Sequence, residues 1–80
     1  MPRKKRIPAM ASRKLVRLLR KAGAIRDREG KGDHTIYKRI VNNQTMKAPV
    51  QMGKRELPPV YCLVVFRQLG LTDEEIDAIL

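Results

Sequence analysis

Two short turns, at residues 30–33 and 42–44, separate three segments of strand type, and this spacing constrains the fold more than any other feature of the sequence. The segments cover residues 24–29, 34–41 and 45–50, and the turns between them are rich in Gly, Asn and Asp. Turns of this length join antiparallel neighbours, because parallel strands need a much longer crossover. The sequence therefore predicts a three-stranded antiparallel meander with helices packed on one of its faces.

A helix is predicted between Ser12 and Gly23, ahead of the first strand. Ser12 is suited to be the N-cap, and Gly23 suits the left-handed residue that ends a helix. Apolar residues recur there at helical spacing: Leu15, Val16, Leu18, Leu19 and Ala22. The other side is basic: Arg13, Lys14, Arg17, Arg20 and Lys21. We expect one apolar face on the sheet and a basic face outside, which is more often merely solvated than bound to a ligand.

Two more helices are predicted after the sheet. Pro58-Pro59 opens the first, and Gly70 ends it; the run between them has strand-like propensity, but its length favours a buried helix. Thr72 and Glu75 form a capping box for a short last helix. The predicted fold is α+β, in the order α-β-β-β-α plus a C-terminal helix. Residues 1–11 are expected to be a basic flexible tail, and residues 12–80 a single domain.

The charge balance points to a polyanionic partner. The chain has 18 Lys+Arg against 8 Asp+Glu, a net charge of +10. Cations near phosphates release counterions, so nucleic acid is the favoured ligand, and an acidic protein is the alternative. Cys62 is the only cysteine, which predicts no disulfide and no metal cluster. No apolar stretch is long enough to span a membrane, and no secretory signal is recognisable, so we expect a cytoplasmic protein.

His34 is the only histidine and follows a loop with two glycines. Its side chain has an ordinary pKa of about 6.5 and can exchange a proton near neutral pH. Strand alternation groups His34 with Ile36 and Lys38, and Thr35 with Tyr37 and Arg39. Ile36 and Tyr37 disagree about which face is buried, and we predict Tyr37 inside and His34 on the open face. A lone histidine is more often a surface or packing residue than a catalyst.

Several short motifs resemble those of the HicA family, also called YcfA-like, the small mRNA-interferase toxins of HicAB toxin–antitoxin modules. The resemblance covers residues 12–71 and rests on the order and spacing of five motifs: Lys21-Ala22-Gly23, Gly32-Asp33-His34 with Tyr37, Pro49, Arg55-Glu56-Leu57-Pro58 and Arg67-Gln68-Leu69-Gly70-Leu71.

The resemblance implies a fold like the double-stranded-RNA-binding domain, metal-independent cleavage of mRNA and neutralisation by a HicB-like antitoxin. It gives His34 the catalytic position, as general acid or base. Asp33 departs from the serine usual in the family, and its carboxylate would favour the protonated imidazole. The expected RNA-binding residues are Lys31, Gly32, Lys38, Arg39 and Lys54. Tyr37 is a weaker candidate for the acid, and neither a metal nor a small-molecule cofactor is expected.

Three alternatives remain open. A non-catalytic RNA-binding module of the same fold would use only shape and phosphate contacts. Residues 58–80 could instead form a DNA-binding helix-turn-helix, although the acidic last helix would repel the DNA backbone. A pure protein-interaction partner would lack affinity for polyanions.

Overall fold

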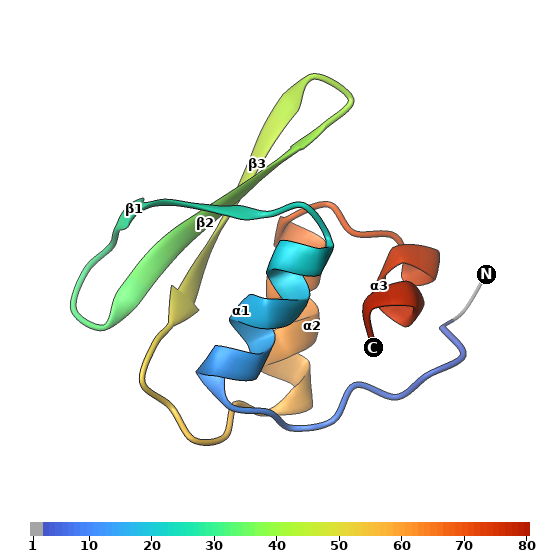
Figure 1. The fold of residues 1–80 in the computed structure, drawn as a ribbon, viewed down its shortest axis with the longest axis horizontal. Helices are drawn as coiled ribbons and strands as arrows, with labels where there is room; N and C mark the ends of the chain where they lie inside the picture. Colours follow the sequence, from blue (N-terminus) through green and yellow to red (C-terminus); the bar gives the residue numbers. More distant parts are fainter. Residues whose placement is uncertain (1–2) are drawn as a thin grey trace.

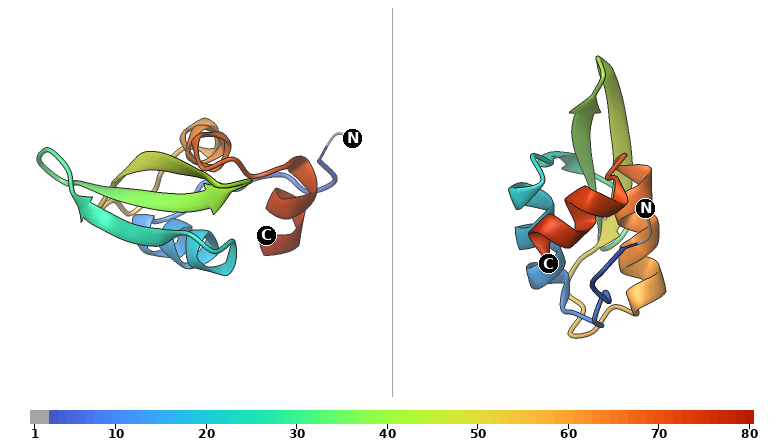
Figure 2. Two further views of the ribbon diagram at one scale, coloured as in Figure 1. Left: turned by 90° about the horizontal axis from the view of Figure 1, so that it is seen from above. Right: turned by 90° about the vertical axis from the view of Figure 1, so that its right-hand side faces the viewer.

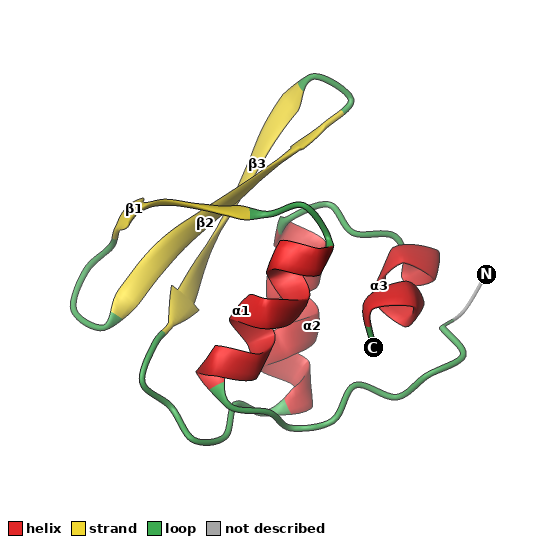
Figure 3. Ribbon diagram, in the orientation of Figure 1, coloured by secondary structure: helices red, strands yellow, loops and turns green. Residues whose placement is uncertain are grey.

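The computed structural model describes residues 3–80, and it confirms the predicted α+β fold with a three-stranded antiparallel sheet in the order β1-β2-β3 (Figures 1 and 3). The elements, in chain order, are α1 (Ser12–Lys21), β1 (Ile25–Glu29), β2 (His34–Val41), β3 (Gln44–Gln51), α2 (Pro59–Gln68) and α3 (Asp73–Ile79). The predicted boundaries are close to those observed, because they were set by local turn and cap residues.

The β2–β3 hairpin is regular over its whole length and extends beyond the helices (Figure 1). Its register runs from His34 opposite Gln51 to Val41 opposite Gln44. The two residues between the strands, Asn42 and Asn43, have φ angles of 50° and 66°. A two-residue turn with both φ positive matches the twist of antiparallel strands, and asparagine tolerates this conformation better than most residues.

One face of the sheet is covered and the other is open. The buried residues of β2 and β3 are Thr35, Tyr37, Ala48 and Val50, which all belong to one alternation. The helices α1 and α2 lie side by side against this face, α1 nearest β1 and α2 nearest β3 (Figure 2). Tyr37 is inside, as predicted, and His34 lies on the opposite, open face.

The hydrophobic core lies between the sheet and the helices. Its largest fully buried side chains come from the three helices, the C-cap of α2 and β3: Phe66, Leu15, Leu19, Leu69, Ile76 and Val50. The apolar run of α2 is helical, as its length predicted. Cys62 is buried there as a small apolar side chain, and burial raises the pKa of its thiol.

Ser12 is not the N-cap that its position suggests. The N-cap is Ala11, without a side-chain bond, and Ser12 is the first helical residue. The Ser12 hydroxyl donates to the carbonyl of Gln51 at 2.7 Å and accepts from the Lys54 N–H at 3.0 Å. The hydroxyl therefore ties the start of α1 to the end of β3, and this tertiary use replaces the local cap.

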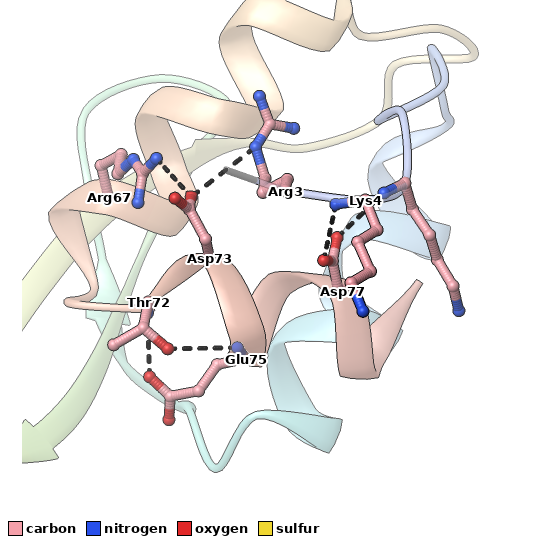
Figure 4. A network of polar contacts seen from close by, with 8 residues as sticks. Arg3, Lys4, Arg67, Thr72, Asp73, Glu75 and Asp77 are labelled. Carbon is pink, nitrogen blue, oxygen red and sulfur yellow. Dashed lines mark hydrogen bonds and ion pairs between the residues drawn. The ribbon is translucent and has the colours of Figure 1, made fainter. Parts of the chain in front are cut away.

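The described part of the segment before α1, residues 3–11, packs on the protein. The sequence predicts a basic flexible tail over residues 1–11, of which residues 1 and 2 lie outside the described part of the chain. Ile7 and Met10 are buried, and Met10 forms a two-hydrogen-bond bridge with Leu57. Further back, the N–H groups of Lys4 and Lys5 donate to Asp77 at 2.8 and 3.1 Å (Figure 4). These bonds, with Lys4 contributing most, lower the pKa of Asp77. The segment thus lies along α3.

The last helix begins as predicted. The Thr72 hydroxyl accepts from the Glu75 N–H, and the Glu75 carboxylate accepts from the Thr72 N–H, which completes the capping box (Figure 4). Asp73, in the first turn of α3, pairs with Arg67 of α2 at 2.6 Å and with Arg3 at 3.8 Å. Together with the bonds to Asp77, these contacts engage three acidic side chains of α3 within the protein.

Candidate active site and nucleic-acid interface

His34 is held at the first position of β2 by the turn that precedes it. Its N–H donates to the carbonyl of Lys31 at 3.0 Å, and its own carbonyl accepts from the Gly30 N–H at 2.8 Å. Gly30 must be small, because a Cβ there would lie 3.1 Å from the His34 carbonyl oxygen and 3.2 Å from Ile36. The side chain of His34 is half-buried, so its ring is both positioned and reachable.

The imidazole of His34 makes one polar contact that defines its chemistry. Its Nδ1 lies 3.2 Å from the carbonyl oxygen of Lys31. A carbonyl oxygen can only accept, so the hydrogen bond requires the proton on Nδ1 and leaves the lone pair of the neutral ring on Nε2. In this arrangement Nε2 is the ring nitrogen that can accept a proton. Within residues 3–80, the Asp33 carboxylate has no hydrogen bond or ion pair with this ring.

Lys38 lies on the same face as His34, about 13 Å further along the strand. Its cross-strand neighbour is Lys47, and the two ammonium groups approach Asp27 at 3.5 and 3.3 Å. Asp27 occupies the irregularity in β1, where Arg28 also contacts it at 3.4 Å. Desolvation opposes ionisation of Asp27, but Lys47 and Lys38 outweigh it and lower its pKa. The face therefore carries a cationic cluster around one carboxylate.

The structure separates Arg39 and Tyr37 from His34. Both side chains lie on the helix side of the sheet, and Tyr37 is 3% exposed. The Arg39 guanidinium donates to the carbonyls of Ala22 at 2.8 Å and Leu69 at 3.2 Å, and it pairs with Glu75. Arg39 is thus a structural link between β2, the end of α1 and the α2–α3 region. Tyr37 is not placed to act as the acid beside His34.

The remaining predicted residues lie at one end of the sheet. Lys31 and Gly32 belong to the β1–β2 turn, where Gly32 has a φ of +58° that favours glycine. Lys54 lies in the β3–α2 loop, and its carbonyl accepts from the Ser12 N–H at 3.0 Å. Asp33 joins the two loops, because its carbonyl accepts from the Met52 N–H at 2.8 Å. The loops that flank His34 are therefore fixed to each other.

The sequence reasoning missed Lys47 and did not assign the arginines of α1. A signal for Lys47 existed, since strand alternation and the two-residue hairpin place it opposite Lys38. In the part of the chain that the structure describes, no three His, Cys, Asp or Glu side chains are grouped to hold a metal ion. The same residues contain no helix with the length and apolar character needed to cross a membrane.

The comparison with known families found a match to most of the chain. The model of a family described as HicA toxin of bacterial toxin–antitoxin matches residues 12–71, which include α1, the sheet and α2. No curated protein and no solved structure was found to match the chain significantly. The matched range contains His34 and all the loops around it.

Proposed function

The chain belongs to the HicA toxin family, because the family model matches most of its length, and from this premise we propose that it is a metal-independent endoribonuclease that cleaves mRNA. The chain carries the toxin domain of a toxin–antitoxin system. The observation that supports the catalytic step most directly is the contact between His34 Nδ1 and the Lys31 carbonyl, because it leaves Nε2 as a base.

The proposed reaction uses the 2′-hydroxyl of the RNA as nucleophile. Nε2 of His34 takes the 2′-OH proton, the 2′-oxygen forms a bond to phosphorus, and the bond to the 5′-oxygen of the next nucleotide breaks. The departing oxygen gains a proton from the imidazolium or from water. The products are a 2′,3′-cyclic phosphate and a 5′-hydroxyl. Lys31, in the turn beside His34, stabilises the charge that develops on the oxygens of the reacting phosphate, and Lys38, about 13 Å along the strand, binds a more distant phosphate of the RNA.

The chemistry predicts the ends of the fragments and a tolerance of chelators. We expect purified protein to cut RNA at an unchanged rate in excess EDTA, because His34 moves the proton without a metal-bound water. End analysis should find 2′,3′-cyclic phosphates and 5′-hydroxyls. Fragments with 5′-phosphates, or a reaction that stops in EDTA, would contradict the proposed mechanism. A parallel reaction with added Mg²⁺ and no EDTA is the control, because it shows how far a change in RNA folding alone alters the cleavage rate.

We further propose that a HicB-like antitoxin covers the open sheet face and masks His34 with acidic groups. Two exposed isoleucines support this surface: Ile25, 58% exposed and opposite Lys38 in the β1–β2 register, and Ile40, 71% exposed in the same alternation as Lys38. Large apolar side chains beside a cationic cluster are suited to an acidic protein with an apolar centre.

This interface predicts a separation of inhibition from cleavage. We expect the double variant Ile25→Ser/Ile40→Ser to cut free RNA normally, because neither side chain is buried or near the reacting atoms. It should need about tenfold more antitoxin for half inhibition, since two apolar anchors are lost. The matched control is Val60→Ser/Val64→Ser, which removes two exposed side chains of α2. Equal inhibition of both variants, or a complex with His34 open to solvent, would refute the assignment.

A further inference from the structure

A basic groove lies on the helix side of the protein, away from the open sheet face. It has a volume of about 640 Å³ and runs between α1 and the β3–α2 loop. Its charged lining consists of Arg13, Arg17, Arg20, Lys54 and Arg55, and Tyr37 forms part of its wall. The three arginines of α1 follow the spacing i, i+4, i+7, so they share one stripe of the helix.

None of the five cations of the groove has an acidic partner within residues 3–80, whereas the cations of the open sheet face share Asp27. Four of the five are arginines, whose planar guanidinium groups bind phosphate oxygens through two hydrogen bonds. Arg13 and Arg20 are separated by about 10 Å along the helix axis. At about 3.4 Å per nucleotide of a stacked strand, this length spans roughly three phosphates.

The groove continues toward His34. A second hollow, of about 580 Å³, shares Tyr37, Met52, Gly53 and Lys54 with the first. Its far end is lined by Gly32 and Asp33, which directly precede His34 in the chain. Glu29 also lines this hollow, where it pairs with Arg26. The Met52 N–H to Asp33 carbonyl bond fixes the two loops on either side of the passage.

We propose that this groove binds the sugar–phosphate backbone of single-stranded RNA and leads it to His34 around the end of the sheet. The inference rests on the proposed function, and it adds a binding path through Arg13, Arg17, Arg20 and Arg55. The cations bind phosphates rather than bases, so the groove supplies affinity and direction without sequence preference. An acidic protein is the less favoured occupant, because the exposed arginines of the groove follow a line along α1, as the phosphates of a strand do.

The test compares two double variants of the same helix in a His34→Ala background, where RNA stays intact. Arg17→Ala/Arg20→Ala removes two cations of the groove, and Lys14→Ala/Lys21→Ala removes two exposed cations that do not line it. The probe is a fluorescein-labelled, mixed-sequence single-stranded RNA, measured by anisotropy over a series of salt concentrations. We expect the groove pair to weaken binding about tenfold and to reduce the salt slope by about 1.4, and the control pair to change affinity less than about twofold.

Equal losses of RNA affinity in the two double variants, or no loss in Arg17→Ala/Arg20→Ala, would overturn the inference. A groove pair that keeps its RNA affinity but loses affinity for the antitoxin would make this a protein-docking surface, which also overturns it. Arg17→Lys/Arg20→Lys should keep the salt slope, and unchanged melting temperatures show that all variants are folded. Failure of the proposed function is distinguishable: a protein with His34 intact that binds RNA and never cuts it refutes the nuclease, while the difference between the pairs still stands.

Discussion

The His34→Ala variant is expected to cleave RNA about 10²–10⁴-fold more slowly than the wild type, because it loses the group that moves the proton. Its fold and its affinity for RNA should be retained, since the ring is only half-buried and its one hydrogen bond is to the Lys31 carbonyl. Cleavage is measured with purified protein, binding by anisotropy and folding by thermal melting. Growth after induction provides the cellular readout: arrest with fragmented mRNA only for the wild type.

A second substitution separates proton transfer from packing. His34→Asn keeps a side-chain N–H that reaches the Lys31 carbonyl but has no titratable nitrogen, so it should be as inactive as His34→Ala. Lys31→Ala keeps the backbone carbonyl that orients the ring but loses a cation near the phosphate, so it should retain part of the activity that both His34 variants lose. Full activity in His34→Asn would show that the ring is structural. If the wild type binds RNA but does not cleave it, the protein is a non-catalytic RNA-binding module.

The Arg39→Ala variant should lose about 2–4 kcal/mol of its free energy of unfolding, with little change in RNA affinity at temperatures where it is folded. The substitution removes the donors to the Ala22 and Leu69 carbonyls and the partner of Glu75. The control is Arg67→Ala, whose more exposed ion pair with Asp73 should contribute less than about 1 kcal/mol. Stability is measured by urea unfolding. A variant of normal stability with weakened RNA binding would contradict the structural role and restore the predicted one.

The pairing of Glu75 with Arg39 makes the stability of the protein depend on pH, and the pKa of Glu75 gives the direction. The Thr72 N–H and, to a smaller extent, Arg39 lower the pKa of Glu75. A carboxyl whose pKa is lower in the folded state stabilises the protein above its unfolded pKa of about 4.3, and this contribution is lost as the pH falls through the folded value. We therefore expect wild-type stability to decrease below about pH 4.3. Arg39→Ala should show a smaller decrease, because one cause of the shift is gone.

Most of the fold could be predicted because its signals are local. The turns at residues 30–33 and 42–44, the glycine after α1 and the Thr72–Glu75 capping box act within a few residues of the chain. The position of His34 followed from the same signals, since the turn fixes where β2 begins and alternation sets its face. Ile36 and Tyr37 point to opposite faces as the buried one, and in the structure Tyr37 is the buried residue.

The features that could not be predicted involve residues whose partners are remote in the sequence. Ser12 has the right residue type for an N-cap, but it bonds to Gln51 and Lys54, about 40 positions away. Strand alternation places Arg39 on the same face as Tyr37, but its positive charge led to the prediction that it binds RNA. The two carbonyls that accept from its guanidinium lie 17 and 30 residues away in the sequence, so local patterns do not indicate them. The basic groove also joins α1 to the β3–α2 loop. The periodicity of α1 predicts that its arginines share one face, but the loop that faces them is known only from the fold.

The contact between the N-terminal segment and α3 has a consequence for how the chain reaches this state. The Lys4 N–H and the Asp77 carboxylate are 73 positions apart, so this bond closes a loop of nearly the whole sequence. Such closure is entropically costly and slow relative to formation of helices and hairpins. During synthesis, the segment before α1 has no partner at Asp77 until nearly all the other elements exist. We therefore expect the N-terminal segment to dock on α3 late, after the sheet and the site around His34 have assembled.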